Sequence, residues 1–210
     1  MFQFIEKKFY NPGLLEATMP SETFENLSSF CSSQIENKDA NYKMKRALFT
    51  DNLVSGIEEA IYVNTPALYK EFILEFSKKY VEYFDVEMYK NTKPVISDSW
   101  INLQKKYEYR PVHNHDSSSD LSFVTYIKIP FSRNEEDSYP NHFRSKIFRN
   151  GKIEFVYNGL DGKQHRKQFD IDETYEGKTL LFSSSLLHVV YPFYTSSEYR
   201  ISLAGNIKFN

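Results

Sequence analysis

Arg110-Pro111-Val112-His113-Asn114-His115-Asp116 places two of the five histidines of this chain one residue apart. Alternate side chains of an extended strand leave the same face, so His113 and His115 are expected to point the same way. Two imidazoles on one face are a ready pair of metal ligands. His188 and Arg200 lie in two later apolar strands, and we expect these strands to bring the three imidazoles to one metal ion, with the arginine behind it.

The sequence around this stretch alternates as β-strands require. After Pro94 the apolar spacing changes from a helical period to a period of two. Asn150-Gly151 is typical of a hairpin turn, and Ile129-Pro130 is expected to end a strand because proline removes a ladder donor. The polar segment 132–143 is expected to be a loop over the mouth of the fold. Strands are predicted near 98–104, 107–113, 121–129, 144–149, 152–157, 164–171, 178–183, 187–192 and 198–208.

The N-terminal part of the chain is helical in pattern. Apolar residues recur at helical spacing after Ser21, a candidate N-cap, and again after Thr65 and Pro66, expected as cap and first helical residue. Residues 1–10 are expected to form an edge strand. The expected buried stripe of the second helix includes Leu68, Phe72 and Phe76.

Helices followed by many short strands predict a mainly β fold, in which a helical layer packs on a two-sheet barrel or jelly roll. The 210 residues suit one domain, 1–210, with a mostly helical layer over 1–95 and the β core over 96–210.

Composition narrows the class of protein. Hydrophobic residues make up 40% and charged residues 26%, which is typical of a globular chain. The net charge of −2 gives no bulk electrostatic case for nucleic acid or an anionic membrane. No apolar run is long enough to span a bilayer, and Cys31, the single cysteine, has no disulfide partner in the chain. We therefore expect a soluble cytoplasmic protein.

The order of the motifs resembles a known superfamily. His-x-His, then Asp120-Leu121-Ser122-Phe123-Val124-Thr125-Tyr126, then His188, then Arg200-Ile201-Ser202 is similar to the 2-oxoglutarate- and iron(II)-dependent dioxygenases. Trp100-Ile101-Asn102 and the ending Ser202-Leu203-Ala204-Gly205-Asn206 resemble its phage-type 2OG-Fe(II) oxygenases, which are similar to prolyl hydroxylases. The likeness covers roughly residues 97–207.

This resemblance implies a double-stranded β-helix core that uses Fe(II), 2-oxoglutarate and O2, with ascorbate as an auxiliary reductant. It implies hydroxylation of a small-molecule or peptidyl substrate with release of succinate and CO2, in the host cytoplasm for a phage-encoded chain. Carried over residue by residue, it makes His113 and His188 metal ligands and Arg200 the partner of the far carboxylate of 2-oxoglutarate. The remaining residues that it places in the cosubstrate pocket are Ser202, Tyr126 and Asn102.

His115 departs from the wider superfamily pattern, which has a carboxylate at this place. Asp116 is the alternative second ligand, since a bulge at Asn114 would turn it toward the metal. Two other functions also stay open: a three-histidine iron dioxygenase that uses no 2-oxoglutarate, and a non-catalytic jelly-roll binding or virion module. His142 and His165 lie in polar surroundings and are expected to be ordinary surface residues.

Overall fold

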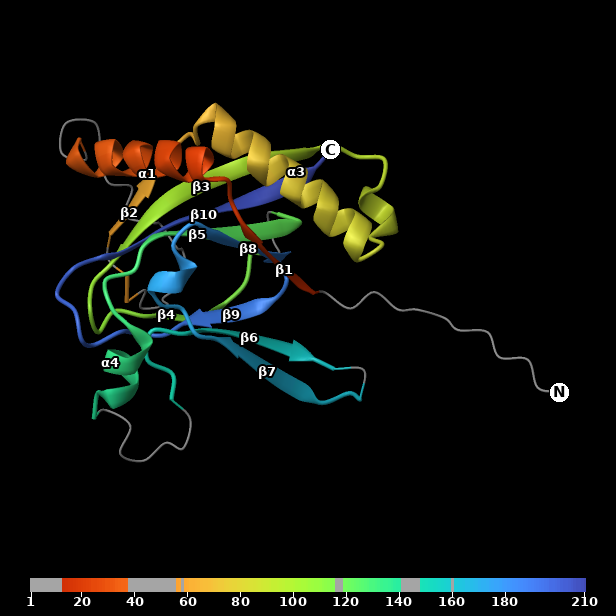
Figure 1. Ribbon diagram of the computed structural model, residues 1–210. Coiled ribbons are helices and arrows are strands. Elements are labelled where there is room, and N and C mark those ends of the chain that lie inside the picture. Colours follow the sequence, from red (N-terminus) through yellow and green to blue (C-terminus); the bar gives the residue numbers. More distant parts are fainter. Residues whose placement is uncertain (1–12, 38–55, 58, 116–118, 141–147, 160) are drawn as a thin grey trace.

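Two antiparallel sheets face each other, and helices cover the outer side of the larger one (Figure 1). The computed structural model describes residues 13–37, 56–57, 59–115, 119–140, 148–159 and 161–210. The larger sheet has the order β1-β8-β5-β10-β3-β2, and the smaller has the order β4-β9-β6-β7. The strands are β1 (Leu14–Thr18), β2 (Glu59–Tyr62), β3 (Pro94–Gln104), β4 (Arg110–His113), β5 (Leu121–Lys128), β6 (Ile153–Asn158), β7 (Gln164–Phe169), β8 (Lys178–Ser183), β9 (Leu187–Val190) and β10 (Arg200–Phe209). The helices are α1 (Ser21–Glu36), α3 (Ala67–Tyr83), α4 (Arg133–Ser138) and the short 3-10 turns η1 (Glu87–Tyr89) and η2 (Glu173–Tyr175).

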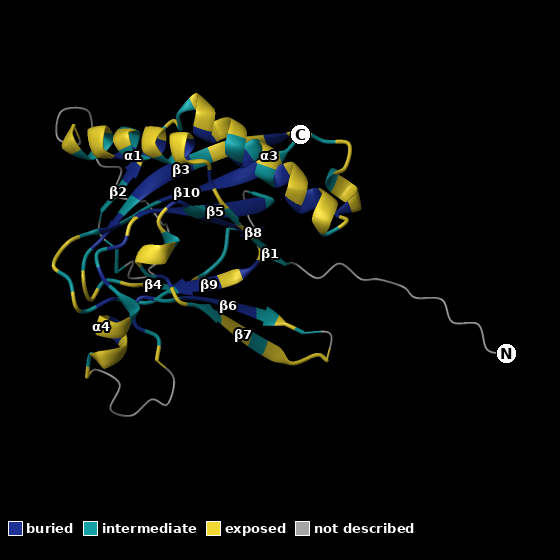
Figure 2. Ribbon diagram, viewed as in Figure 1, coloured by how far each residue is buried: buried dark blue, intermediate teal, exposed yellow. Residues whose placement is uncertain are grey.

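The central strands of the larger sheet are buried on both faces. In β5, Leu121 and Phe123 belong to the apolar cluster shared with α1 and α3. Tyr126, which points the other way, belongs to a second cluster between the two sheets. Apolar residues therefore occur on both faces of β5 and not only at alternate positions, as expected of a strand that is buried on both sides. Figure 2 shows the buried strands in dark blue beneath the exposed outer sides of the helices.

Close contact between neighbouring strands requires a glycine in β10. An added Cβ at Gly205 would lie 2.6 Å from the carbonyl oxygen of Asp98 and 2.5 Å from the ring of Phe123. A real Cβ does not approach other atoms so closely, so any side chain here would push β10 away from β3. Because β10 also carries Arg200 and Ser202, this contact helps to set the position of both.

Most of the strands predicted after residue 97 are confirmed, with one shift, and the larger sheet contains two strands that were not predicted, β1 and β2. The segment near 107–113 forms a strand only from Arg110, because Tyr107 has a left-handed φ of 71° and ends the preceding turn. Residues 148–149 are not in a strand. The predictions for 1–10 and for most of 144–149 lie outside the described residues.

Two predictions about helix starts are wrong. Helix α1 begins at Ser21 itself, with Pro20 before it, and α3 begins at Ala67, after Pro66. Neither helix has a side-chain cap, so Ser21 and Thr65 do not play the expected role. The prolines hold φ near −57°, which already suits entry into a helix and makes a polar cap less necessary.

The buried face of α3 is turned by about one residue from the predicted stripe. Leu68 is 38% exposed, whereas Tyr69 and Ile73 are fully buried. Phe72 and Phe76 pack only at the margin of the core. The Tyr69 hydroxyl lies 2.6 Å from the Thr125 hydroxyl of β5, and this buried polar contact favours tyrosine over leucine as the inward residue.

The polar segment predicted as a loop over 132–143 contains the helix α4. Ser132 and Glu135 form a capping box at its start. Glu136 is fully buried, and its carboxylate accepts hydrogen bonds from the backbone of Tyr194 and from Thr195. The Glu136 carboxylate therefore holds the loop before β10 in place.

No helix among the described residues is both long enough and apolar enough to cross a membrane.

Candidate active site

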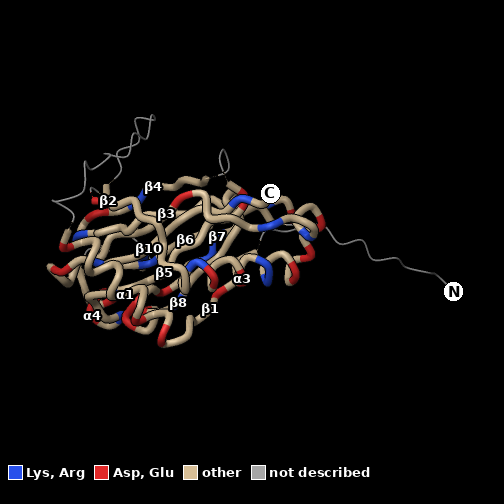
Figure 3. Tube along the Cα trace, turned by 90° about the horizontal axis from the view of Figure 1, so that it is seen from above, with Lys and Arg blue, Asp and Glu red and all other residues tan. Residues whose placement is uncertain are grey.

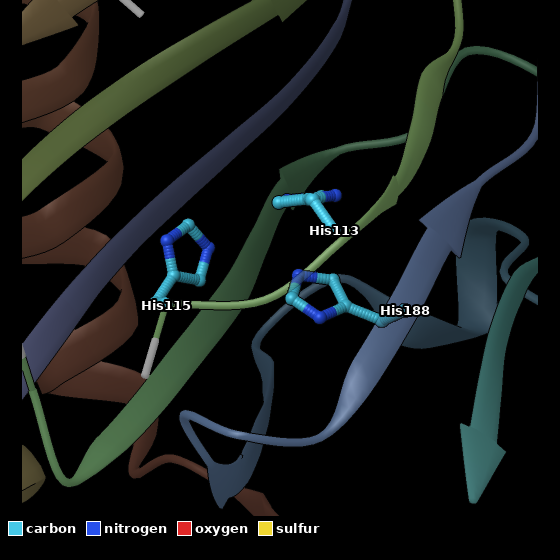
Figure 4. Close-up of side chains that lie close together, drawn as sticks. All are labelled: His113, His115 and His188. Atoms are coloured by element: carbon cyan, nitrogen blue, oxygen red, sulfur yellow. The ribbon is translucent and has the colours of Figure 1, made fainter. Parts of the chain in front are cut away.

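The three histidines meet between the two sheets. His113 ends β4, His115 follows two residues later, and His188 lies in β9, where its Cα is paired with that of His113. The ring centroids of His113 and His188 are 4.2 Å apart, and that of His115 is 5.1 Å from His113 and 5.5 Å from His188. Figure 4 shows the three rings gathered around one space. One ligand atom from each ring lies within 4.8 Å of the other two.

Hydrogen bonds to the backbone fix which ring nitrogen is free in two of the three imidazoles. Nδ1 of His113 lies 2.7 Å from the carbonyl oxygen of Pro111, and Nδ1 of His188 lies 2.9 Å from that of Leu186. A carbonyl can only accept, so each Nδ1 carries the proton and each Nε2 keeps its lone pair. The His115 backbone N–H donates to the carbonyl of Ser184 at 2.8 Å, which ties this segment to the turn before β9.

Burial keeps these imidazoles neutral. It is the largest cause that lowers the pKa of His113 from 6.5 to about 4, and the charge of Arg110 contributes to the same shift. Burial is also the largest cause that lowers the pKa of His115 to about 4 and places the pKa of His188 well below its usual value. A metal ion therefore meets lone pairs at neutral pH and has no proton to displace.

The donor set fits a divalent transition metal. Imidazoles suit Fe, Zn, Cu and Ni, whereas Mg and Ca prefer oxygen ligands. Two nitrogens bound to one ion at about 2.1 Å are at most about 4.2 Å apart, so small side-chain rotations would close the observed group around an ion. Three protein ligands would leave the remaining coordination positions of such an ion open to small molecules.

A pH dependence follows for the metal-free protein. The unfolded chain takes up protons on its histidines near pH 6.5, while folded His113 resists protonation until about pH 4. The unfolded state thus binds more protons in this window, and the free energy of unfolding should fall as pH falls from about 6.5 to about 4. The change is measured as the midpoint of denaturant-induced unfolding at a series of pH values across this range. The His113→Gln variant should show a shallower slope, and equal slopes would contradict the assignment.

The histidines open into a cavity of about 70 Å³. Alternate residues of three neighbouring strands line its floor, as the period of two requires. Ser202 of β10 has its Cα paired with those of Asn102 on β3 and Tyr126 on β5, and all three line the cavity. Arg200 and Gln104 form the next pair of the same face. The structure therefore brings all the predicted metal and cosubstrate residues that it describes to one cavity.

Arg200 lies at the closed end of this cavity and is 3% exposed. Its Nε and Nη2 both donate to the Gln104 side-chain oxygen, at 2.9 and 2.5 Å. Nη1 donates to the carbonyl of Gly151 at 2.7 Å, and Nη2 to that of Tyr191 at 3.2 Å. A guanidinium has five N–H groups, so one on Nη1 remains available. Burial lowers the pKa of Arg200 to about 10, which still leaves it charged at neutral pH.

Tyr126 adds a hydroxyl beside this guanidinium. It is 3% exposed and lines the cavity, burial raises its pKa although the charge of Arg200 opposes this, and its hydroxyl makes no hydrogen bond to the described residues. A hydroxyl in the lining of the cavity can donate a hydrogen bond to a ligand or accept one from it. Ser202 and Asn102 are joined by only a long contact of 3.5 Å, so their polar groups are also open to a ligand.

Of the three other histidine or carboxylate residues singled out in the sequence, the structure describes only His165. Asp116 and His142 lie outside the described residues. His165 lies on the β7 hairpin, with Nε2 2.9 Å from an oxygen of Asp161, and takes no part in the cavity. The cavity residues that sequence reasoning missed include Gln104 and Arg110. The alternation of β3 could have indicated Gln104, because it shares a face with Asn102.

The chain was compared with known proteins. Residues 98–206, more than half of its length, match the model of the family described as "Putative 2OG-Fe(II) oxygenase". A search of curated protein sequences found no match.

Solved structures show the same fold at low identity. A Pseudomonas putida prolyl-4-hydroxylase is 12% identical, with a TM-score of 0.53 over 94% of this chain and 92% of the other. AviO1 from Streptomyces viridochromogenes is 11% identical, with a TM-score of 0.55 over 95% and 91%. EctD from S. alaskensis, solved with 2-oxoglutarate and 5-hydroxyectoine, is 11% identical, with a TM-score of 0.56 over 94% and 72%. The likeness confirms the predicted jelly-roll core with its helical layer.

Proposed function

Because the chain belongs to the 2OG-Fe(II) oxygenase family, whose members use Fe(II), 2-oxoglutarate and O2, we propose that it hydroxylates a small-molecule or peptidyl substrate and releases succinate and CO2. One oxygen atom of O2 goes to the substrate hydroxyl and the other to the new carboxylate of succinate. We further propose that residues 1–210 act as one such domain. The observation that carries the proposal is the meeting of three neutral imidazoles and a buried arginine in one cavity.

The proposed role of His113, His115 and His188 is to hold Fe(II) through one nitrogen each. Bound there, Fe(II) supplies the activation of O2 that couples loss of CO2 from 2-oxoglutarate to oxidation of a substrate C–H bond. The Pro111 and Leu186 carbonyls orient two of the rings and fix their tautomers. The surrounding phenyl rings keep water out, with Phe182 5.0 Å and Phe155 6.0 Å from the His188 ring.

The proposed role of the closed end is to bind the far carboxylate of 2-oxoglutarate. Arg200 offers the remaining N–H and its charge, and Tyr126 offers its hydroxyl. Ser202 and Asn102 lie beside them on the same floor and complete a polar pocket. Charged hydrogen bonds in a dry site are stronger than in water, which favours a dianionic cosubstrate.

One observation favours a second candidate. The Gln104 oxygen accepts from both Nε and Nη2 of Arg200, the paired donors that a carboxylate would otherwise use. An arginine held in this way could be structural, and the three imidazoles would then serve an iron dioxygenase without 2-oxoglutarate. The two candidates differ in whether 2-oxoglutarate binds and whether succinate forms.

The test is an assay of the purified protein with Fe(II), ascorbate and 2-oxoglutarate in air, following succinate. We expect slow uncoupled succinate formation even without the substrate. Binding of 2-oxoglutarate to the Mn(II)-loaded protein is measured alongside, because it does not require turnover. Failure of both measurements would exclude the 2-oxoglutarate reaction and leave the three-histidine iron dioxygenase and the non-catalytic module.

A further inference from the structure

The floor of the cavity continues past the candidate metal ligands as one further row of side chains. Paired residues of β3, β10 and β5 form four rows on this face, which are Gln104–Arg200, Asn102–Ser202–Tyr126, Trp100–Ala204–Val124 and Asp98–Asn206–Ser122. The His115 ring lies 5.9 Å from the ring of Trp100, so it stands beside the third row. Two residues of a strand span about 6.6 Å, which places the fourth row one such step farther from Arg200.

Asp98 is a half-buried carboxylate in this fourth row, and it has no ion pair with the residues that the structure describes. Its Oδ1 accepts from Nδ2 of Asn206 at 2.8 Å, and Oδ1 of Asn206 accepts from the Ser122 hydroxyl at 2.8 Å. Asn206 and Ser122 are 4% and 2% exposed, so two buried side chains hold this carboxylate in one orientation. Its Oδ2 is met only by the Ser97 hydroxyl at 3.4 Å. One oxygen of Asp98 can therefore accept from a further donor.

Two aromatic rings stand beside Asp98 on the same face. Tyr62 of β2 is paired with Trp100, and their ring centroids are 6.0 Å apart. Tyr62 is 38% exposed and Trp100 is 9% exposed, so this pair extends from solvent inward to the ring of His115. The faces of tyrosine and tryptophan rings attract cations, most strongly where water is partly excluded. A carboxylate beside two such rings favours a positively charged group.

The balance of charge at Tyr62 agrees with this reading. Burial is the largest cause that raises the pKa of Tyr62, the charge of Asp98 is the next, and the opposing effect of Arg110 is smaller. The acidic side chain therefore has the stronger influence at this outer end of the cavity. The rest of the surface gives no such bias, because acidic and basic residues are interspersed in the view of Figure 3. Selection of a cation would thus depend on this local group.

From this arrangement, and resting on the proposed function, we propose that Asp98, Trp100 and Tyr62 bind a cationic nitrogen group of the substrate, so that the enzyme acts on an amine or on a basic residue of a peptide. The carboxylate supplies a charge-assisted hydrogen bond, and the rings supply cation–π contacts. With the cation held in the fourth row, a C–H bond of the same molecule lies one row inward, beside the three histidines. Asp98 is a specificity-determining residue at the outer end, while Arg200 serves the cosubstrate at the closed end.

Trp100 provides the measurement, because it is the single tryptophan of the chain and lines the cavity. Protein saturated with Mn(II) and 2-oxoglutarate is titrated at constant ionic strength with n-butylammonium, N-acetyl-lysine amide or the neutral analogue n-butanol. We expect a saturable change in Trp100 fluorescence with at least one of the two cations and none with n-butanol. Tighter binding of the blocked lysine indicates a basic residue of a peptide, and tighter binding of n-butylammonium indicates a free amine.

Variants connect this response to the proposed group. Asp98→Asn keeps an oxygen that can accept from Asn206, but it should weaken the cation affinity by about tenfold or more, the effect of losing a charged hydrogen-bonding partner. Tyr62→Leu should weaken it by about threefold through loss of one ring. Asp161→Asn, the same change as the first on an exposed turn, should keep all of it.

The contrary results are equally defined. A response that is absent for both cations, equal for n-butanol, or unchanged in a folded Asp98→Asn protein overturns the proposal. The 2-oxoglutarate affinity is measured in the same samples. If Asp98→Asn weakens 2-oxoglutarate binding as much as it weakens cation binding, Asp98 supports the whole cavity and the inference is wrong. If 2-oxoglutarate does not bind the Mn(II)-loaded wild type, the proposed function itself has failed, even where the cations still bind.

Discussion

The His188→Ala variant is expected to lose more than about a hundredfold in affinity for Fe(II) or Mn(II), because it removes a direct ligand, whereas loss of an outer-shell partner alone costs about 10–100-fold. His188 is 5% exposed and stands opposite His113 in the ladder. Metal content after dialysis against a weak chelator, together with a direct titration, measures the change. Succinate formation should be lost with the metal.

A matched control is available in the same chain. His165→Ala makes the same substitution on an exposed hairpin and should leave metal affinity and succinate formation unchanged. Because the His188 ring packs against Phe182, the thermal midpoint of each variant is measured to show that it is folded. Wild-type metal affinity in a folded His188→Ala protein would refute the assignment of this ligand.

Arg200→Ala is expected to weaken 2-oxoglutarate binding by about 2–3 kcal/mol, the cost of losing a charged hydrogen-bonding partner, while metal affinity stays close to that of the wild type. Titration of 2-oxoglutarate into the Mn(II)-loaded protein measures both quantities. Arg200 also holds the carbonyls of Gly151 and Tyr191, so its removal leaves buried acceptors and should lower stability. Binding must therefore be compared with variants that keep the guanidinium.

Two such variants exist. Gln104→Glu places a negative charge against Nε and Nη2 of Arg200, which should neutralise the guanidinium and weaken 2-oxoglutarate binding without loss of folding. Tyr126→Phe removes only a hydroxyl that has no partner among the described residues, so stability should hold while affinity falls by about 1 kcal/mol. Wild-type 2-oxoglutarate affinity in all three variants would show that this end of the cavity has another purpose.

The β core could be predicted from the sequence because alternation and turn residues are local signals. The candidate site could also be predicted to a large extent, since His113 and His115 follow strand spacing and Arg200 and Ser202 share a face. The convergence of His188 with this pair depends on which strands become neighbours. That information is not local, and in this chain it came from the resemblance to a family.

The errors have a common physical cause, which is competition between local preference and tertiary packing. Leu68 fits the helical stripe by hydrophobicity, but Tyr69 reaches Thr125 and takes the inner position. Glu136 looks like part of a solvated run, yet its carboxylate satisfies the backbone of the 194–195 segment. The partnership of Gln104 with Arg200 crosses two strands, and single-sequence patterns do not encode it.

The hydrogen bonds of the His113 and His188 Nδ1 atoms to backbone carbonyls have a further consequence for the evolution of this cavity. His113 and His188 are each oriented by the carbonyl two positions earlier in their own segment, at Pro111 and Leu186. Every amino acid has a backbone carbonyl, so no substitution at position 111 or 186 can remove this acceptor. The cavity lining can therefore change toward new substrates while the orientation of these two imidazoles is kept.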